Sequence, residues 1–235
     1  MEDFFPDDGI IVKLFTMLTW VIPVAFSIIP HEIAHGYAAL LMGDTTAKDE
    51  GRLSFNPLKH VDWYGTVILP LFLMISRIGI VFGYAKPVPV DFSKMKNIRK
   101  GLIVVAAAGP AANFALAAVF VFFLYLLNMH KDENNLLWLF LYASFIRAVL
   151  VNLCLGVFNL IPLPPLDGGK ILIGILPLEM GKKVAAWDGR KGLTLLFVLL
   201  ILPAFFGEDC DVIGMIVNTV VKAILSLPFL AGLQI

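Results

Sequence analysis

Long apolar stretches alternate with short polar ones along the chain, and their spacing predicts membrane-spanning helices. A helix needs about 20 consecutive, mostly apolar residues to cross the hydrocarbon core of a bilayer. The strongest candidates are residues 10–42, residues 102–127, and a span from about 136 into the region 159–165, where prolines must break or kink it. Two further apolar segments, 193–206 and 212–230, close the chain. No soluble domain, internal repeat or low-complexity linker is left between them, so the pattern predicts an all-α polytopic membrane protein.

One apolar run, residues 64–82, allows two arrangements. It contains Pro70, Ser76 and Arg77, which suit a re-entrant or hairpin element better than a helix facing lipid. We therefore expect five transmembrane helices, with six as the alternative, and a membrane-associated hairpin or re-entrant segment between the first and second strong spans.

The distribution of positive charge favours the hairpin. If residues 64–82 enter and leave on the same side, the Lys/Arg-rich loops 43–101 and 179–191 share that side, and the other side keeps only Lys131. Cytoplasmic loops of membrane proteins carry an excess of Lys and Arg. The two loops are therefore expected to be cytoplasmic, in a multi-pass protein of a cell membrane.

Composition agrees with this fold class and excludes others. Hydrophobic residues make up 59% of the 235 positions and charged residues only 15%, whereas soluble domains are near half apolar and a quarter charged. The formal net charge is zero, so nothing indicates binding to nucleic acid. The two cysteines, Cys154 and Cys210, lie in or beside apolar runs and are expected to be packing residues rather than a disulfide.

Candidate chemistry lies in the first span, at His31-Glu32-x-x-His35. Residues four apart in a helix project from one face, so both imidazoles can reach a single zinc ion. Glu32 is rotated by about 100° from His31, a position that suits a general base for water rather than a metal ligand. Ionisable residues at membrane depth are candidates for function by default.

A catalytic zinc site needs a third protein ligand and an open fourth position. His60 and His130 fall in loops among charged residues, where a solvated or interfacial histidine is the ordinary interpretation. Asp167 is the better candidate, because it follows a proline-rich stretch between long apolar segments and precedes Gly168. An Asp-Gly pair usually marks a turn, but a turn at membrane depth needs a cavity or a ligand to satisfy its backbone.

Two motifs together resemble those of a known family. HEIAHG from His31 and NLIPLPPLDGG from Asn159 look like the signature motifs of the site-2 proteases, peptidase family M50. The segment from Ala108 to Asn113 looks like the family's Gly-Pro element. GRLSFNPLKHVD from Gly51 and GYAKPVPV further on resemble the compact prokaryotic branch that lacks PDZ and CBS domains. The resemblance covers about residues 25–175.

The resemblance implies a zinc-dependent endopeptidase that cuts transmembrane segments of membrane protein substrates, as in regulated intramembrane proteolysis. By it His31, His35 and Asp167 would bind one Zn²⁺ per chain and Glu32 would activate water. Asn159 is implied to hold substrate or the developing oxyanion, and Asn113 to do something similar. The chain would be one membrane-embedded peptidase domain, 1–235, with a catalytic core at about 10–178 and C-terminal helices at about 190–231.

Other interpretations remain open at this point. A metal-ion transporter would use the same ligands, together with further ligands along a path and repeat symmetry; a catalytically silent relative would bind membrane segments without cutting them. A substrate strand would need an exposed backbone edge, which residues 83–90 or 51–55 supply unless they are ordinary loops. Asn152 is expected to make interhelical hydrogen bonds, and Lys170 to support the Asp167 loop. The partners expected are a transmembrane substrate and the bilayer, with the oligomeric state open.

Overall fold

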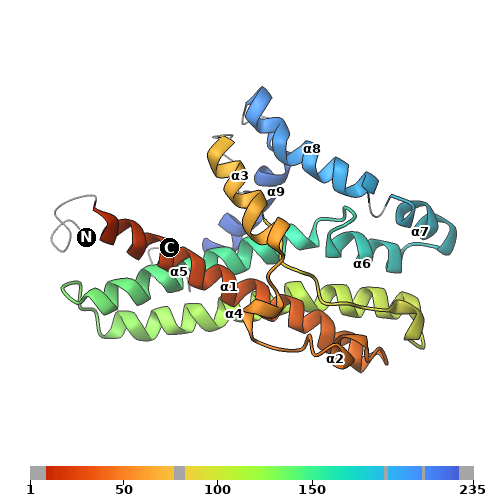
Figure 1. Ribbon diagram of the computed structural model, residues 1–235, viewed down its shortest axis with the longest axis horizontal. Coiled ribbons are helices and arrows are strands. Elements are labelled where there is room, and N and C mark those ends of the chain that lie inside the picture. The colour runs from red at the N-terminus through yellow and green to blue at the C-terminus, as the bar shows by residue number, and fades with distance from the viewer. Residues whose placement is uncertain (1–8, 77–82, 188–189, 208–209, 228–235) are drawn as a thin grey trace.

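The computed structural model describes residues 9–76, 83–187, 190–207 and 210–227, and every regular element within these ranges is helical (Figure 1). The expectation of an all-α protein is confirmed for this part of the chain. The elements follow one another in the order α1 to α9, with short helical turns between α2 and α4.

Three long apolar helices form the framework: α1 (Ile10–Leu41), α4 (Ile98–Met129) and α5 (Leu136–Leu160). Within the described ranges they are the helices whose length and composition allow a membrane crossing. The 32 residues of α1 and of α4 extend about 48 Å, more than the hydrocarbon core requires. All three pack against one another (Figure 1). Side chains from each of them can therefore contact one another in the space between the three helices.

After α5, the described residues form four shorter helices: α6 (Asp167–Ile175), α7 (Leu178–Ala185), α8 (Arg190–Phe206) and α9 (Val212–Leu225). The apolar parts of α8 and α9 are shorter than a full crossing, so a total of five or six spans stays a prediction. The sequence did not predict α6 or α7. The packing of α6 on α4 brings the 167 region back to the framework.

In the described part of the stretch between α1 and α4, the regular elements are short. They are α2 (Thr46–Asp49), a 3₁₀ turn (Pro57–Lys59), a π-helical segment (Trp63–Ile68) that runs into α3 (Leu69–Ser76), and a second 3₁₀ turn (Phe92–Lys94). The predicted hairpin falls partly on 77–82, outside the described residues, and stays a prediction. Residues 83–91 have no regular structure, so neither they nor 51–55 form a strand.

Helix ends follow local chemistry. After α1, Gly43 has φ +104°, a left-handed conformation that glycine adopts without a steric penalty. The side chain of Asn97 accepts a hydrogen bond from the N–H of Lys100 at the start of α4, and Asn135 does the same for the first turn of α5. Such caps satisfy backbone groups that the helix leaves without partners. The framework helices therefore begin and end where the sequence predicts, within a few residues.

Candidate metal centre

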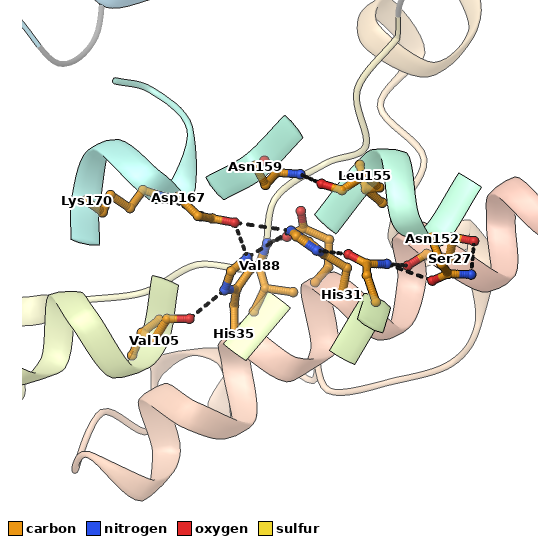
Figure 2. A network of polar contacts seen from close by, with 12 residues as sticks. Ser27, His31, His35, Val88, Val105, Asn152, Leu155, Asn159, Asp167 and Lys170 are labelled. Carbon is orange, nitrogen blue, oxygen red and sulfur yellow. Dashed lines mark hydrogen bonds and ion pairs between the residues drawn. The ribbon is translucent and has the colours of Figure 1, made fainter. Parts of the chain in front are cut away.

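The two histidines of the first motif lie on one face of α1 and inside the protein. His31 is 5% exposed and His35 8%, and their Nε2 atoms are 3.1 Å apart. The four-residue spacing therefore has the predicted consequence, because both imidazoles present the same nitrogen to one point (Figure 2).

Asp167 reaches this point from α6, as expected from the sequence. Its Oδ2 lies 3.3 Å from Nε2 of His31 and 3.1 Å from Nε2 of His35, and the residue is 4% exposed. Asp167-Gly168 does not form the turn that such a pair usually marks, because Asp167 is the first residue of α6. A Cβ on Gly168 would lie 2.3 Å from the carbonyl oxygen of Leu160. Glycine thus lets α6 begin directly against the end of α5 and fixes the place of the carboxylate.

The other nitrogen of each imidazole has its own acceptor. Nδ1 of His31 donates to Oδ1 of Asn113 at 2.6 Å, and Nδ1 of His35 donates to the carbonyl oxygen of Val105 at 2.7 Å (Figure 2). Both acceptors come from α4. A carbonyl oxygen can only accept, so each Nδ1 carries the proton and each Nε2 has a free lone pair.

Three lone-pair atoms therefore face one another at the centre of the protein: two Nε2 atoms and Oδ2 of Asp167. That oxygen is buried and has no hydrogen-bond partner. Such an arrangement is repulsive unless a cation lies between the atoms. Donors bound about 2.0–2.1 Å from one zinc ion are about 3.3 Å apart in a tetrahedron, close to the separations of 3.1, 3.3 and 3.1 Å found here. The donor set fits zinc.

Behind His31, Asn113 belongs to a buried polar network that joins α1, α4 and α5. Its Nδ2 donates to the carbonyl oxygen of Ser27 and to Oδ1 of Asn152, and Nδ2 of Asn152 donates to Oγ of Ser27 (Figure 2). Asn113 and Asn152 are both 0% exposed. The expected interhelical role of Asn152 is confirmed. The substrate contact implied for Asn113 stays a prediction, and in this structure its amide is buried and hydrogen-bonded to His31, Ser27 and Asn152.

Gly109 allows α4 to pack closely against the two histidine rings of α1. A Cβ at this position would lie 2.5 Å from Nε2 of His35 and 2.6 Å from Cε1 of His31. The Gly-Pro element noted in the sequence therefore makes room for the two rings, while Asn113, four residues later on the same helix face, holds one of them. The features of the sequence that could have indicated this role are an asparagine within an apolar helix and a glycine four residues before it.

Glu32 and Asn159 lie beside the three donors without joining them. Oε2 of Glu32 accepts the backbone N–H of Val88 at 2.9 Å, and Nδ2 of Asn159 donates to the carbonyl oxygen of Leu155 at 3.0 Å (Figure 2).

The side chains of Glu32 and Asn159 both line two cavities. The larger, about 770 Å³, is mostly apolar and lies between the π-helical segment with α3 and the residues of α5 and α8. The smaller, about 370 Å³, contains His35 and Asp167.

The remaining polar residues noted in the sequence lie elsewhere or act indirectly. Nζ of Lys170 donates to Oδ1 of Asp167 at 3.2 Å, which confirms its expected supporting role and leaves Oδ2 for the metal. His130 is exposed, whereas His60 is 3% exposed and donates from Nε2 to the carbonyl oxygen of Ser54, so of the two expected forms His60 is not the solvated one. Arg147 donates to Thr19 and lies over the ring of Trp20, 5.1 Å from its centroid. Both cysteines are free, as expected.

Comparisons with known proteins point to the same chemistry. The model of peptidase family M50 matches residues 19–141 and 128–203. "Putative zinc metalloprotease YwhC" of Bacillus subtilis is 37% identical over 186 residues, which cover 78% of this chain and 80% of that protein. "Putative zinc metalloprotease Rip2" of Mycolicibacterium smegmatis is 31% identical over 74% of this chain and 63% of its own length. "Zinc metalloprotease MJ0392" of Methanocaldococcus jannaschii is 28% identical over 54% of this chain and 39% of its own length. No solved structure matches the chain significantly.

Proposed function

The chain belongs to peptidase family M50, and on that premise we propose that it is a zinc-dependent intramembrane endopeptidase in which His31, His35 and Asp167 hold the metal. The observation that carries the proposal is the convergence of three buried lone-pair atoms within 4.8 Å of one another, with the carboxylate of Glu32 beside them. The family and the apolar helices make it an integral membrane protein.

The reaction needs a water nucleophile and an electrophilic carbonyl carbon. A bound zinc ion supplies both effects, because it lowers the pKa of water and polarises a carbonyl oxygen. Glu32 takes a proton from the attacking water and passes it to the leaving amide nitrogen. Oε2 accepts the Val88 N–H, so Oε1 is the atom assigned to this transfer. His31 and His35 donate their Nδ1 protons to Asn113 and Val105, so Nε2 is the atom that each imidazole would offer to the metal.

Asn159 is proposed to hold substrate or the developing oxyanion. It lines both cavities, so a chain that crosses from one to the other passes its side chain. Its Nδ2 has two protons and uses one for the carbonyl oxygen of Leu155, which leaves one for a substrate carbonyl. Oriented donors of this kind stabilise negative charge as it develops.

The proposed substrate is a transmembrane segment that has unwound near its cleavage site. The larger cavity has a mostly apolar lining that includes Ile68, Phe72 and Phe197, which suits apolar side chains. A peptide bond within a helix is shielded by the helix's own hydrogen bonds, so the segment must be extended locally before attack. Residues 83–85, which border the same cavity, are the proposed backbone against which it lies.

The proposed topology has five spans, formed by α1, α4, α5, α8 and α9, with residues 64–82 as a hairpin. The 17 residues of α8 are at the lower limit for a crossing, and the apolar sequence after α9 continues to Leu230. The Lys/Arg-rich loops 43–101 and 179–191 are proposed to be cytoplasmic, in a prokaryotic cell membrane.

Metal-dependent cleavage tests the proposed function against its two rivals. Purified full-length protein in detergent is given fluorophore-labelled casein, an unfolded chain that needs no unwinding. We expect cleavage that a chelator such as 1,10-phenanthroline abolishes and added zinc restores, because removal of the metal removes the nucleophile and the electrophile together.

Two results would contradict the proposal. Cleavage that survives complete removal of zinc would exclude a metalloprotease. A zinc-loaded protein that cuts neither casein nor any of a set of single-span peptides would favour the silent binder. The transporter predicts a series of ligand groups along a path, and the described ranges contain a single such cluster.

A further inference from the structure

A segment without regular structure holds the carboxylate of Glu32. We name residues 84–90 the strap. It contains the sequence Lys86-Pro87-Val88-Pro89, and since proline has no N–H, Val88 supplies the single backbone donor between residues 87 and 89. That N–H donates to Oε2 of Glu32 at 2.9 Å. Val88 lies beside the two histidines (Figure 2).

Anchors on both sides of Val88 hold the strap. On one side Arg52, 8% exposed, donates from one guanidinium nitrogen to the carbonyl oxygens of Lys86, at 2.9 Å, and Pro87, at 3.2 Å. The N–H of Lys86 donates to the carbonyl oxygen of His60 at 2.8 Å.

On the other side of Val88, the N–H of Asp91 donates to Oδ2 of the buried Asp44 at 2.7 Å. Val88 therefore has little freedom to move along α1.

The side chain of Val88 is also fixed, because it packs on the glycine that follows the metal-binding motif. Val88 is 6% exposed. A Cβ on Gly36 would lie 2.9 Å from Cγ1 of Val88 and 2.4 Å from Cδ2 of Leu53. Gly36 thus lets the strap lie directly on α1, one turn after Glu32. The same contact fixes the position along α1 at which the Val88 N–H reaches the carboxylate of Glu32.

We propose that Arg52 and the strap position the catalytic base: Arg52 clamps the carbonyls of Lys86 and Pro87 so that the Val88 N–H holds one oxygen of Glu32. A glutamate has three rotatable side-chain bonds, and a base displaced by about 1 Å loses much of its effect. When the Val88 N–H holds Oε2, the orientation of the carboxylate is fixed, and so is the position of Oε1. Arg52 is then a positioning residue, and the inference rests on the proposed role of Glu32.

Amide hydrogen exchange tests the contact without substrate or metal. Since Pro87 and Pro89 have no amide proton, the Val88 signal is free of overlap from its neighbours. The full-length proteins are wild type, Glu32→Met, Arg52→Met and Arg99→Met. Arg99 is the matched control, because it clamps the carbonyls of Gly174, Ile175 and Leu176 instead.

We expect slow exchange of the Val88 amide in wild type and Arg99→Met, and exchange at least about 10-fold faster in Glu32→Met and Arg52→Met, because a lost hydrogen bond to a charged group is worth about that factor. The Lys86 amide should stay protected in Glu32→Met. An unchanged Val88 rate in Glu32→Met or in folded Arg52→Met overturns the proposal.

A backbone variant covers the case in which Arg52→Met does not fold. Replacing Val88 with its α-hydroxy acid turns the N–H into an ester oxygen and keeps the side chain. The matched control is the same exchange at Val90, whose N–H has no hydrogen-bond partner within the described ranges. The measured quantity is the affinity of acetohydroxamate, which binds zinc and donates a proton to a neighbouring carboxylate.

Both esters should retain one zinc per chain. The Val88 ester should bind acetohydroxamate about 10-fold more weakly than wild type, and the Val90 ester should match wild type. Equal affinity of all three proteins overturns the positioning role. If the chain binds no zinc at all, the proposed function fails in that measurement, whereas the exchange experiment still decides whether the strap holds Glu32.

Discussion

Replacing Asp167 with alanine is expected to leave the protein folded but to weaken zinc binding by more than about 100-fold. The reason is that Oδ2 is one of the three protein donors that converge at the centre of the described structure, at 3.3 and 3.1 Å from the two Nε2 atoms. Losing a residue that merely supports a ligand already costs about 10–100-fold in affinity, so losing a ligand costs more. Cleavage of labelled casein should become undetectable, and zinc content after dialysis is the measurement.

The control for this prediction is Asp211→Ala. Asp211 is also at a helix start, where its Oδ1 accepts the N–H of Gly214 and caps α9, but it belongs to no group of candidate ligands in the described ranges. Zinc content should equal that of wild type. Full zinc retention in Asp167→Ala would remove Asp167 from the ligand set.

Glu32→Gln is expected to keep one zinc per chain and to lose activity by about 10²–10⁴-fold, the usual contribution of a general base. Glutamine has the size of glutamate and its oxygen can still accept the Val88 N–H, so the geometry around Oε2 should persist. What it lacks is a group that takes a proton from water. The loss should therefore fall on kcat, with KM for labelled casein near the wild-type value.

Glu179→Gln is the matched control, because Glu179 is exposed and pairs only with Lys182 at 2.9 Å in the described structure. It should behave as wild type in both constants. A Glu32→Gln protein that keeps wild-type kcat, or that loses its zinc, would contradict the assignment of Glu32 as the base outside the ligand set.

Much of the site follows from the sequence because local spacing determines it. His31 and His35 lie four residues apart in a helix, so their convergence needs no tertiary information. Asp167 could be proposed because an unpaired carboxylate between apolar segments needs a partner. The ends of α1, α4 and α5 followed, within a few residues, from the length of the apolar runs.

What the sequence could not supply depends on contacts between distant segments. Two glycines after Asp167 disfavour a helix by local propensity, yet α6 begins there because Gly168 packs against the backbone of Leu160. The orientation of His31 by Asn113 joins residues 82 positions apart, and the contact of Val88 with Glu32 joins residues 56 apart. The predicted apolar segment 212–230 contains α9, which ends at Leu225, and its last residues, 228–230, lie outside the described residues.

X-ray absorption at the zinc edge of the detergent-purified wild-type protein tests the central claim most directly, since it reports the atoms bound to the metal. The account predicts one zinc per chain with only nitrogen and oxygen neighbours at about 2.0–2.1 Å and the outer-shell scattering of two imidazoles, from His31 and His35. A sulfur neighbour at about 2.3 Å, or a spectrum with other than two imidazoles, would contradict it.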